Sequence, residues 1–592
     1  MEKDTKRLLL RTGNDEGRPH RRSSPISLTH PVSPPPKRRK LSEHPPREIA
    51  GSETASDVAS EVTTSDEEER ERQKPISGES ETQRPDIEKT DISKKLEGPS
   101  LHSQGRFSSP FHLTKIRDLV PELNIDAVTL EDILGDPLIS ECWEFNYLHD
   151  IDFLLNAFDQ DVRNLVKVHV IHGFWKREDS SRLQLQEQAS RHSNVTLHSA
   201  FMPEMFGTHH SKMMILLRHD ETAQIVIHTA NMIVRDWTNM TQAVWLSPRL
   251  PLIASTQPEG QDEEPRTGSG AKFKIDFLNY LRSYDTRQLT CKPIIDELIK
   301  YDFSAIKGYL IASVPGRHNV RDDSPTRWGW AAMKQALRAV PVHAAAKSEI
   351  AIQISSIATL GPTDNWLKNT LFRALSGGQD VSEGIQASPG FKVIFPTADE
   401  IRNSLDGYDS GGSIHTKIQS GQQAKQLQYL KPIFCHWAND SVDGAELNAT
   451  VPVQEAGRDR AAPHIKTFIR YGTKPASSSS TIDWALVTSA NLSKQAWGEA
   501  VNTTTGEMRI ASYEIGVLVW PALFAEDAIM KPSFLKDTVN NNDDDGEKEG
   551  APVVALRLPY SLPLQAYGKS EIPWVATASH VLPDWKGEVW TE

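Results

Sequence analysis

"GTHHSKMMILL", residues 207–217, places two histidines and a lysine directly before a run of five apolar residues. A short apolar run without Gly or Pro is typical of a buried strand, so we expect a strand that begins near His210 and Lys212. Side chains alternate in direction along a strand, and these two side chains therefore point to the same side. An imidazole beside an ammonium favours an anion between them. The alternative is an ordinary strand end with a solvated His and Lys.

The same pattern returns in the second half of the chain. In "PHIKTFIRYG", residues 463–472, His464 and Lys466 again precede a short apolar run. After each His-x-Lys a second predicted strand ends on an asparagine: "QIVIHTAN" ends on Asn231 and "DWALVTSAN" ends on Asn491. Repetition of an ordered set of residues, unlike repetition of a single His-x-Lys, indicates an internal duplication.

A helix start and a third strand follow each asparagine. "NMIVRDW" corresponds to "NLSKQAW", and the strands that come next are "MTQAVWLS", which contains Gln242, and "SYEIGVLVW", which contains Glu514. An amide or a carboxylate at this place can hold the far ring nitrogen of a histidine and so orient the imidazole. The alternative is that Gln242 and Glu514 are ordinary strand residues that face solvent.

These residue types suit the transfer of a phosphoryl group. A histidine acts as a nucleophile or as a proton donor near neutral pH, and Lys and Asn side chains supply N–H donors for the phosphoryl oxygens. Two histidines from the two halves could flank one phosphorus atom, one attacking it and the other protonating the leaving oxygen. The four donors of the two sets are Lys212, Lys466, Asn231 and Asn491.

The same residues argue against a metal-dependent reaction. Magnesium is bound through carboxylates, and neither His-x-Lys motif contains one. His209, His210 and His228 form a conceivable zinc set, but Lys212 would crowd a cation at His210 and Cys or Asp partners are missing. We therefore predict a site that needs no metal and no cofactor.

The chain outside the motifs divides into a tail and a globular part. Its 592 residues exceed one hydrophobic core and suggest roughly two to four domains. Residues 1–105 are crowded with Ser, Pro, Glu, Lys and Arg and predict a disordered tail. "PPPKRRK", residues 34–40, favours nuclear import, the alternative being a chance basic run. The net charge is −13, but acidic residues concentrate in stretches such as 65–71, 260–265 and 540–551, so a basic groove elsewhere is not excluded.

Cysteine usage and hydropathy exclude other classes. Cys142, Cys291 and Cys435 lie far apart in the sequence, which argues against a disulfide framework and against a zinc cluster. No apolar run approaches membrane-spanning length, and the start "MEKDTKRLLLR" has too few leucines for a signal sequence. We expect a soluble protein of the nucleus with no membrane partner.

The paired sets resemble the phospholipase D superfamily, whose motif HxK(x)₄D is followed later by GSxN. Leu217 and Tyr471 stand where the Asp of that motif would be. This departure, together with "GTHHSKMM", "HTANMI", "SSIATLG", "VTSANLSKQAWG" and "PYSLPLQAYG", resembles the tyrosyl-DNA phosphodiesterase family. The resemblance runs from about Phe107 to the C-terminus and does not include the tail.

The resemblance implies a DNA-repair hydrolase. Such a metal-independent phosphodiesterase removes a tyrosine of topoisomerase I from the 3′ phosphate of DNA through a covalent phosphohistidine. By this resemblance His210 is the nucleophile, and His464 is the general acid for the tyrosine oxygen and then the base for water. The remaining side chains of the two sets hold the phosphate.

The resemblance also implies residues that contact DNA, both single- and double-stranded, at 3′ ends. Phe206 matches a position that stacks on a base, the alternative being a core Phe. Ser355, Ser356 and Ser493 match positions that meet DNA phosphates. His436, in "FCHW", stands where a lysine that contacts DNA is expected, which puts one backbone contact in question. We expect a monomer with nuclease activity at 3′ ends.

The duplication and the resemblance together predict an α/β fold. Two pseudo-symmetric phospholipase D-like domains, each a mixed β-sheet flanked by helices, are expected at residues 107–318 and 326–592, after a disordered tail at 1–105. The site should lie at the seam between them. Two other functions stay open: a phospholipase or nuclease of the same superfamily, and a catalytically silent protein that binds DNA ends.

Overall fold

The structure is a computed structural model of the chain. The residues that it describes are 101–102, 105–254, 265–342, 347–380, 388–438, 453–473, 480–539 and 551–591. The predicted tail, with the basic cluster at 34–40, lies outside these residues, and so does most of the acidic stretches at 260–265 and 540–551.

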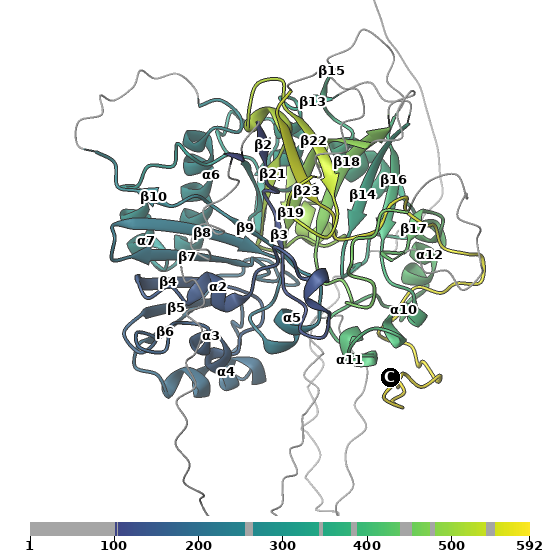
Figure 1. The fold of residues 1–592 in the computed structure, drawn as a ribbon, viewed down its shortest axis with the longest axis horizontal. Coiled ribbons are helices and arrows are strands. Elements are labelled where there is room, and N and C mark those ends of the chain that lie inside the picture. The colour runs from purple at the N-terminus through teal and green to yellow at the C-terminus, as the bar shows by residue number, and fades with distance from the viewer. Residues whose placement is uncertain are drawn as a thin grey trace, which may run out of the picture. The chain divides into compact units, whose positions relative to one another are not determined.

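Two mixed sheets organise the described residues (Figure 1). The first sheet is formed by the first half of the chain, with β4, β5 and β6 parallel to one another and the other pairs antiparallel. In spatial order its strands are β3 (His112–Leu113), β9 (Ala243–Leu246), β8 (Thr222–His228), β7 (Met213–Arg218), β4 (Ile139–Phe145), β5 (Lys167–His172) and β6 (Val195–Ser199), and β10 (Leu250–Pro251) pairs with β8.

The second sheet repeats this order. Its path β21-β19-β18-β14-β16-β17 corresponds to β9-β8-β7-β4-β5-β6 of the first sheet, again with antiparallel pairs followed by two parallel ones. These strands are β21 (Glu514–Val519), β19 (Ser480–Thr488), β18 (Thr467–Thr473), β14 (Lys347–Gln353), β16 (Gly390–Ile394) and β17 (Phe434–Cys435). The duplication predicted from the sequence is therefore present in the fold.

Further strands extend the second sheet or form small ribbons. β11 (Tyr309–Ser313) pairs with β21, and β22 (Ile529–Ser533) pairs with β19 and with β23 (Val553–Arg557). The chain of pairs ends with β2 (Arg106–Phe107) and β1 (Leu101–His102). Two separate two-stranded ribbons are β12 (Gly316–Asn319) with β20 (Glu507–Ile510) and β13 (Pro341–Val342) with β15 (Gln379–Asp380).

Strand pairing departs from the domain limit predicted at residue 318. β11 lies within the predicted first domain, yet it hydrogen bonds along β21 of the second sheet. The reason is the duplication itself: β3 covers the outer edge of β9 in the first sheet, and β11 covers the equivalent edge of β21. An uncovered edge would leave backbone N–H and C=O groups of the third strand unpaired.

Helices cover the outer face of each sheet. On the first sheet these are α2 (Leu130–Leu134), α3 (Ile151–Asn156) and α4 (Ser180–Ser190), and on the second they are α8 (Gly329–Leu337), the π-helical turn η3 (Leu367–Phe372), α9 (Arg373–Leu375), α10 (Ala398–Arg402), α11 (Tyr408–Gly411), α12 (Gly421–Leu430) and α13 (Lys494–Trp497). Short 3-10 turns lie at η1 (Pro121–Leu123), η2 (Ser283–Asp285), η4 (Lys431–Ile433) and η5 (Pro521–Leu523). The mixed α/β architecture agrees with the prediction.

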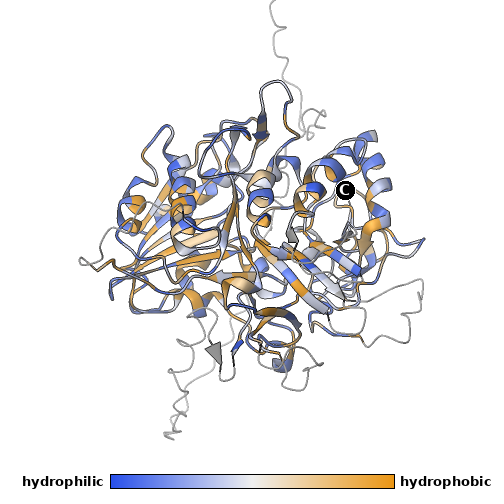
Figure 2. Ribbon diagram, turned by 90° about the horizontal axis from the view of Figure 1, so that it is seen from above, coloured by the Kyte–Doolittle hydropathy of each residue, from blue (hydrophilic) through white to orange (hydrophobic). Residues whose placement is uncertain are grey.

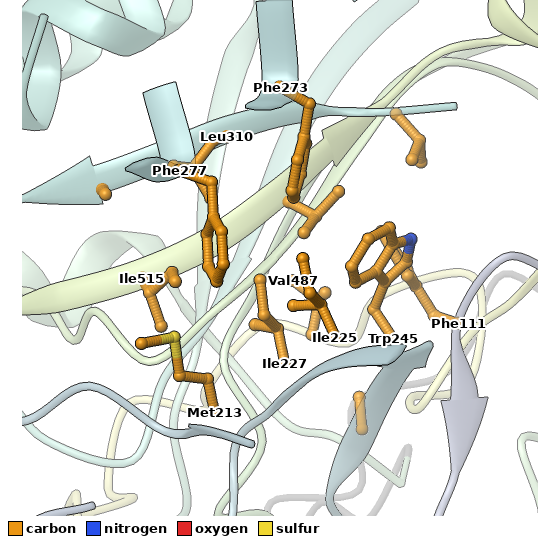
Figure 3. Close-up of a cluster of buried hydrophobic side chains, with 14 of the residues drawn as sticks. Phe111, Met213, Ile225, Ile227, Trp245, Phe273, Phe277, Leu310, Val487 and Ile515 are labelled. Carbon is orange, nitrogen blue, oxygen red and sulfur yellow. The ribbon is translucent and has the colours of Figure 1, made fainter. Parts of the chain in front are cut away.

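A central apolar layer joins the two sheets. α6 (Gly270–Arg282) and α7 (Lys292–Leu298) contribute to this layer, and Figure 3 shows Phe277 of α6 beside Met213 and Ile227 of the first sheet and Val487 and Ile515 of the second. In Figure 2 the hydrophobic colour concentrates on the strands, and the outer helix faces are hydrophilic. Burial of this shared layer holds the two halves together.

β7 shows how the opening stretch of sequence is used. Met213 and Ile215 contribute to the central layer, while Met214 and Leu216 pack under the outer helices, as alternation along a strand requires. Both faces of β7 are covered, which is why "MMILL" is apolar throughout. The predicted buried strand is confirmed, and His210 and Lys212 lie directly before its first residue.

The three cysteines, Cys142, Cys291 and Cys435, are buried and unpaired, in agreement with their spacing. Within the described ranges, no helix combines the length and the apolar character that crossing a membrane requires.

Candidate active site

Each His-x-Lys motif is docked against the third strand of the opposite half. The backbone N–H of His210 donates to the carbonyl of Tyr513 at 3.0 Å, and Tyr513 directly precedes Glu514. In the mirrored arrangement, the N–H of His464 donates to the carbonyl of Thr241 at 3.1 Å. Because Thr241 directly precedes Gln242, each histidine is brought beside the polar residue of the other half.

His210 is held by a carboxylate of the second half. Its Nδ1 lies 2.9 Å from Oε2 of Glu514, and the hydroxyl of Ser489 donates to the same oxygen at 2.6 Å. A carboxylate accepts hydrogen bonds only, so Nδ1 carries the hydrogen and Nε2 keeps a lone pair. This tautomer is the one a histidine nucleophile needs.

His464 is held by two side chains of the first half. Its Nδ1 lies 3.1 Å from Nε2 and 3.3 Å from Oε1 of Gln242, and 3.2 Å from Oδ2 of Asp236. The contact of Gln242 with a histidine agrees with one of the two roles that the sequence left open. Asp236 did not emerge from the sequence, although "NMIVRDW" contains it at the place where "NLSKQAW" has Ala496.

Lys212 and Asn231 bring buried polar atoms into the site. Lys212 is fully buried, and within the described residues neither its Nζ nor Oδ1 of Asn231 has a hydrogen-bond partner. Lys466 is also fully buried, and its Nζ lies 3.2 and 3.1 Å from the two ring nitrogens of His464 and contacts its carbonyl oxygen. Buried ammonium groups such as those of Lys212 and Lys466 are costly unless an anion satisfies them.

The pKa values of the site reflect the burial of its basic groups. Burial lowers the pKa of Lys212 to about 8, and burial together with Lys212 lowers the pKa of Lys466 well below its ordinary value. Burial also lowers the pKa of His210 and, with the help of Lys466, that of His464. A bound phosphate would stabilise the charged form of both lysines, because an adjacent anion favours the ammonium form.

Asn491 is oriented by two of the predicted DNA-contacting serines. The backbone N–H groups of Ser355 and Ser356 donate to Oδ1 of Asn491 at 3.1 and 2.9 Å, which leaves the amide N–H₂ of Asn491 free to point elsewhere. The hydroxyl of Ser493 accepts from the backbone at the start of α13 as its N-cap. All three serines therefore lie beside the second set, and their contact with DNA stays a prediction.

Phe206 lies at the surface. The residue is 47% exposed, and its carbonyl accepts a hydrogen bond at 3.1 Å from Nε2 of Gln495, which belongs to the second half. The core alternative for Phe206 is wrong. An exposed ring four residues before His210 is free to stack on a base.

His436 does not occupy a surface at which a lysine could meet DNA. It is 1% exposed, with Nδ1 3.2 Å from Glu400 and Nε2 2.9 Å from Glu571. Although burial acts against it, the two carboxylates raise the pKa of His436. This histidine is part of a buried triad with two carboxylates, which agrees with the expectation that the backbone contact of a lysine here is in question.

The histidines considered for zinc point to different surroundings. The ring of His209 lies 2.9 Å from the carbonyl of Asn146 and 3.1 Å from the hydroxyl of Tyr284, while burial lowers the pKa of both His209 and His228 to about 3. In the part of the chain that the structure describes, no group of three or more His, Cys, Asp or Glu side chains is arranged to hold a metal ion.

The motif positions that lack the aspartate face the central apolar layer. Leu217 of β7 and Tyr471 of β18 both pack there, at equivalent places of the two halves. Two sheets of the same order, each with a His-x-Lys before its central strand and an Asn after the next, define a hydrolase of the phospholipase D superfamily.

The comparisons with known proteins identify the family. The family model described as tyrosyl-DNA phosphodiesterase matches residues 110–568. The chain therefore belongs to the tyrosyl-DNA phosphodiesterase family and is a phosphodiesterase. The family match does not favour the phospholipase alternative.

Sequence similarity to other tyrosyl-DNA phosphodiesterases extends over most of the chain. A probable tyrosyl-DNA phosphodiesterase of Schizosaccharomyces pombe is 31% identical over 547 residues, which cover 81% of this chain and 95% of that protein. Tyrosyl-DNA phosphodiesterase 1 of Arabidopsis thaliana is 29% identical and covers 82% of this chain and 77% of its own length. The crystal structure of the yeast tyrosyl-DNA phosphodiesterase has the same fold, with a TM-score of 0.53 at 20% identity over 78% of this chain and 98% of that one.

Proposed function

We propose that this protein hydrolyses the bond between a tyrosine of topoisomerase I and the 3′ phosphate of DNA in DNA repair. The observation that carries the proposal is the crossed support of the two histidines: each is held through Nδ1 by a side chain of the other half. Nε2 of each ring is then the nitrogen that would meet the substrate, although in this structure Nε2 of His464 lies 3.1 Å from Nζ of Lys466. The names of the relatives and the family match support the choice of substrate.

In the first step Nε2 of His210 attacks the phosphorus and forms a P–N bond, while the P–O bond to the tyrosine breaks. The proton on Nε2 of His464 passes to the phenolate oxygen. Lys212 and Lys466, together with Asn231 and Asn491, donate to the phosphoryl oxygens as negative charge develops on them.

In the second step water attacks the phosphohistidine and His464 takes the proton of the water. The P–N bond breaks, the electron pair returns to His210, and DNA with a 3′ phosphate is released. This step leaves His464 protonated for the next cycle. A group that acts as the acid in the first step acts as the base in the second.

An oligonucleotide that carries a 3′-phosphotyrosine tests this function. We expect turnover to tyrosine and a 3′-phosphate end in excess EDTA, because the neutralising groups are side chains of the chain itself. Phosphatidylcholine vesicles serve as the matched control and should yield no choline. Loss of turnover in EDTA with recovery in magnesium would contradict the proposal, and so would cleavage of the lipid alone.

We also propose that single- and double-stranded DNA ends bind through Phe206. The support is its exposed ring near His210. Phe206→Ala should raise the KM for a single-stranded phosphotyrosyl oligonucleotide about tenfold with little change in kcat, since base stacking is worth about 1–3 kcal/mol per base. An exposed residue away from the site, Leu165, offers the control Leu165→Ala. Removal of a 3′ nucleoside by the same site would be its nuclease activity.

The proposed location is the nucleus and the proposed state is a monomer. The basic cluster at 34–40 supports the location. Replacement of Lys37, Arg38, Arg39 and Lys40 by Ala should reduce nuclear accumulation of a fluorescent fusion and leave turnover in vitro unchanged. Nuclear accumulation that persists in this variant would contradict the proposed location. Analytical ultracentrifugation tests the oligomeric state, and a sedimenting dimer would contradict the proposed monomer.

A further inference from the structure

Asp236 is a buried carboxylate beside the second histidine. It lies in the short helix α5 (Val234–Thr238), is 0% exposed, and places Oδ2 3.2 Å from Nδ1 of His464. The backbone N–H of Asn231 donates to the same oxygen at 2.7 Å, and the hydroxyl of Ser413 lies 3.3 Å from Oδ1. Although burial raises the pKa of Asp236, these donors favour the ionised form.

Gln242 cannot choose the tautomer of His464 by itself. Its Oε1 accepts from the hydroxyl of Thr229 at 2.8 Å, and its Nε2 donates to the carbonyl of Asp236 at 3.1 Å. Since both ends of the amide lie near Nδ1 of His464, the amide can meet that nitrogen with or without its hydrogen. A carboxylate only accepts, so Asp236 favours a hydrogen on Nδ1, whereas the ammonium of Lys466 is a donor that lies close to both ring nitrogens.

Each histidine has one carboxylate beside it, but the two carboxylates stand at different positions of the repeated sequence. In the second half the carboxylate is Glu514 at the start of the third strand, where the first half has Gln242. In the first half it is Asp236, where the second half has Ala496. Both carboxylates serve the histidine of the opposite half.

His464 needs such a partner because its other charged neighbours are cationic or can become so. Burial lowers its pKa, and the neighbours that lower it further are Lys466, Lys212, His210 and His415. Asp236 itself is faced by Lys466, Lys212 and Arg235. An imidazolium at His464, the form that donates a proton, is therefore opposed by each of these basic neighbours and favoured by Asp236.

We propose that Asp236 is a positioning residue that holds the Nδ1 hydrogen of His464 and sustains its imidazolium for protonation of the leaving phenol. This inference rests on the proposed function, in which His464 is the general acid. In the step, the proton leaves Nε2 of His464 for the phenolate oxygen as the P–O bond breaks. Asp236 stays beside Nδ1, at the 3.2 Å separation of the ion pair, and takes up no proton.

The test compares two leaving groups in single turnovers with Asp236→Asn, which preserves the shape of the side chain. Tyrosine has an ordinary phenol pKa of about 10 and needs an acid, whereas p-nitrophenol leaves readily without one. Release of tyrosine at pH 7.5 should slow about 10- to 100-fold, and release of p-nitrophenol should slow less than about threefold. The rate of tyrosine release should also fall at a lower pH than in the wild type, because loss of the carboxylate lowers the pKa of His464.

Asp276→Asn is the matched control, since Asp276 is a buried carboxylate that pairs with Lys272 in α6. It should leave both rates unchanged. Equal slowing of both leaving groups by Asp236→Asn, or no slowing of either, would overturn the inference. If the wild type releases neither group, the proposed function fails instead.

A second measurement uses the wild-type protein and does not depend on a variant that folds. ¹⁵N NMR of labelled histidine, with His464 assigned by difference from His464→Gln, should show the neutral ring protonated at Nδ1. Protonation at Nε2 would overturn the inference, because Gln242 and not Asp236 would then set the tautomer.

Discussion

The two histidines of the site occupy equivalent positions in the two duplicated halves, but their surroundings differ. His210 meets a single carboxylate, Glu514, and its side chain is 16% exposed. His464 is 5% exposed, meets an amide and a carboxylate, and lies against Lys466. The more open ring, backed by full negative charge, suits attack on phosphorus. Burial and the two lysines lower the pKa of both rings, and the pKa of His464, the more enclosed ring, is lowered well below its ordinary value.

This difference shows that a symmetric backbone does not imply symmetric chemistry. Both motifs dock on the opposite half through equivalent backbone hydrogen bonds. What differs is the charge that surrounds each imidazole, and charge decides protonation and nucleophilicity. The roles of the histidines can therefore be tested by changes that leave the backbone alone.

The largest expected effect comes from the histidines themselves. His210→Ala removes the atom that bonds phosphorus, so turnover should fall by more than about 10³-fold and no covalent species should form. His464→Ala keeps that atom, and a phenolate can leave slowly without help. The second step then lacks its base, which is worth about 10² to 10⁴ in rate, so DNA should stay attached to the protein.

A denaturing gel reads this difference. His464→Ala should show an acid-labile band of protein with oligonucleotide, and the double variant should show none. If His210→Ala traps DNA and His464→Ala does not, the two roles are exchanged. Absence of a band from both single variants would remove the support for covalent catalysis.

The partners of the histidines should rank next. Glu514→Gln removes the sole carboxylate in contact with His210 among the described residues and should lower kcat about 10²-fold. Gln242→Met leaves Asp236 beside His464 and should cost about tenfold or less. Steady-state kinetics on the phosphotyrosyl oligonucleotide measures both. A greater loss of kcat with Gln242→Met than with Glu514→Gln would contradict the view that the carboxylates, and not the amide, support the histidines.

The pH dependence should expose the lysine of the first set. Because the pKa of Lys212 is lowered to about 8, its ammonium form is lost as pH rises through that value. In the kcat/KM of the wild type, which reports the free enzyme, this loss should add a falling limb above pH 8, approaching tenfold per pH unit beyond any fall due to His464.

Lys212→Arg separates the lysine from other groups that titrate in this range. An arginine stays charged, so this variant should be slower at pH 7 and yet lose the falling limb. If the fall of kcat/KM above pH 8 persists in Lys212→Arg and disappears in Lys466→Arg, the titrating group is Lys466 of the second set.

The smallest effect on catalysis is expected at a third histidine, outside the site. His436→Ala leaves Glu400 and Glu571 buried without their cation and should lower the free energy of unfolding by about 3–5 kcal/mol. The kcat of the folded variant should stay within about twofold of the wild type. Chemical denaturation and single-turnover kinetics measure the two quantities. A large loss of kcat in folded protein would mean that His436 does serve the site.

The same triad predicts how stability varies with pH. The folded pKa of His436 is raised, so its contribution is complete below the ordinary value of about 6.5 and is lost as pH rises through the raised value. The melting temperature of the wild type should fall across that interval. His436→Gln should show a flatter dependence, and an equal slope in both proteins would contradict the assignment.

Much of the fold was predictable because the duplication repeats its local signals. The apolar run after each His-x-Lys reads as a strand in both halves, and β7 and β18 are those strands. β11 could not be assigned in this way, because its partner β21 lies about two hundred residues further along the chain, as one expects of non-local sheet pairing. Local pattern does not report which sheet covers an edge.

The sequence by itself determined the residue types of the site and their order. His210 and Lys212, then Asn231, recur as His464, Lys466 and Asn491, and their chemistry points to a phosphoryl group. Side-chain chemistry and spacing along one segment are local properties, and their repetition allows them to be recognised without a structure.

Only the tertiary structure decided which residues meet. It paired Glu514 with His210 and Gln242 with His464 across the seam, brought Asp236 to the second histidine, and buried His436 between two carboxylates. The physical reason is that each contact joins segments distant in sequence, whose approach is set by the packing of the central apolar layer. Burial then changes the charge that each group can carry, and burial is a property of the folded chain.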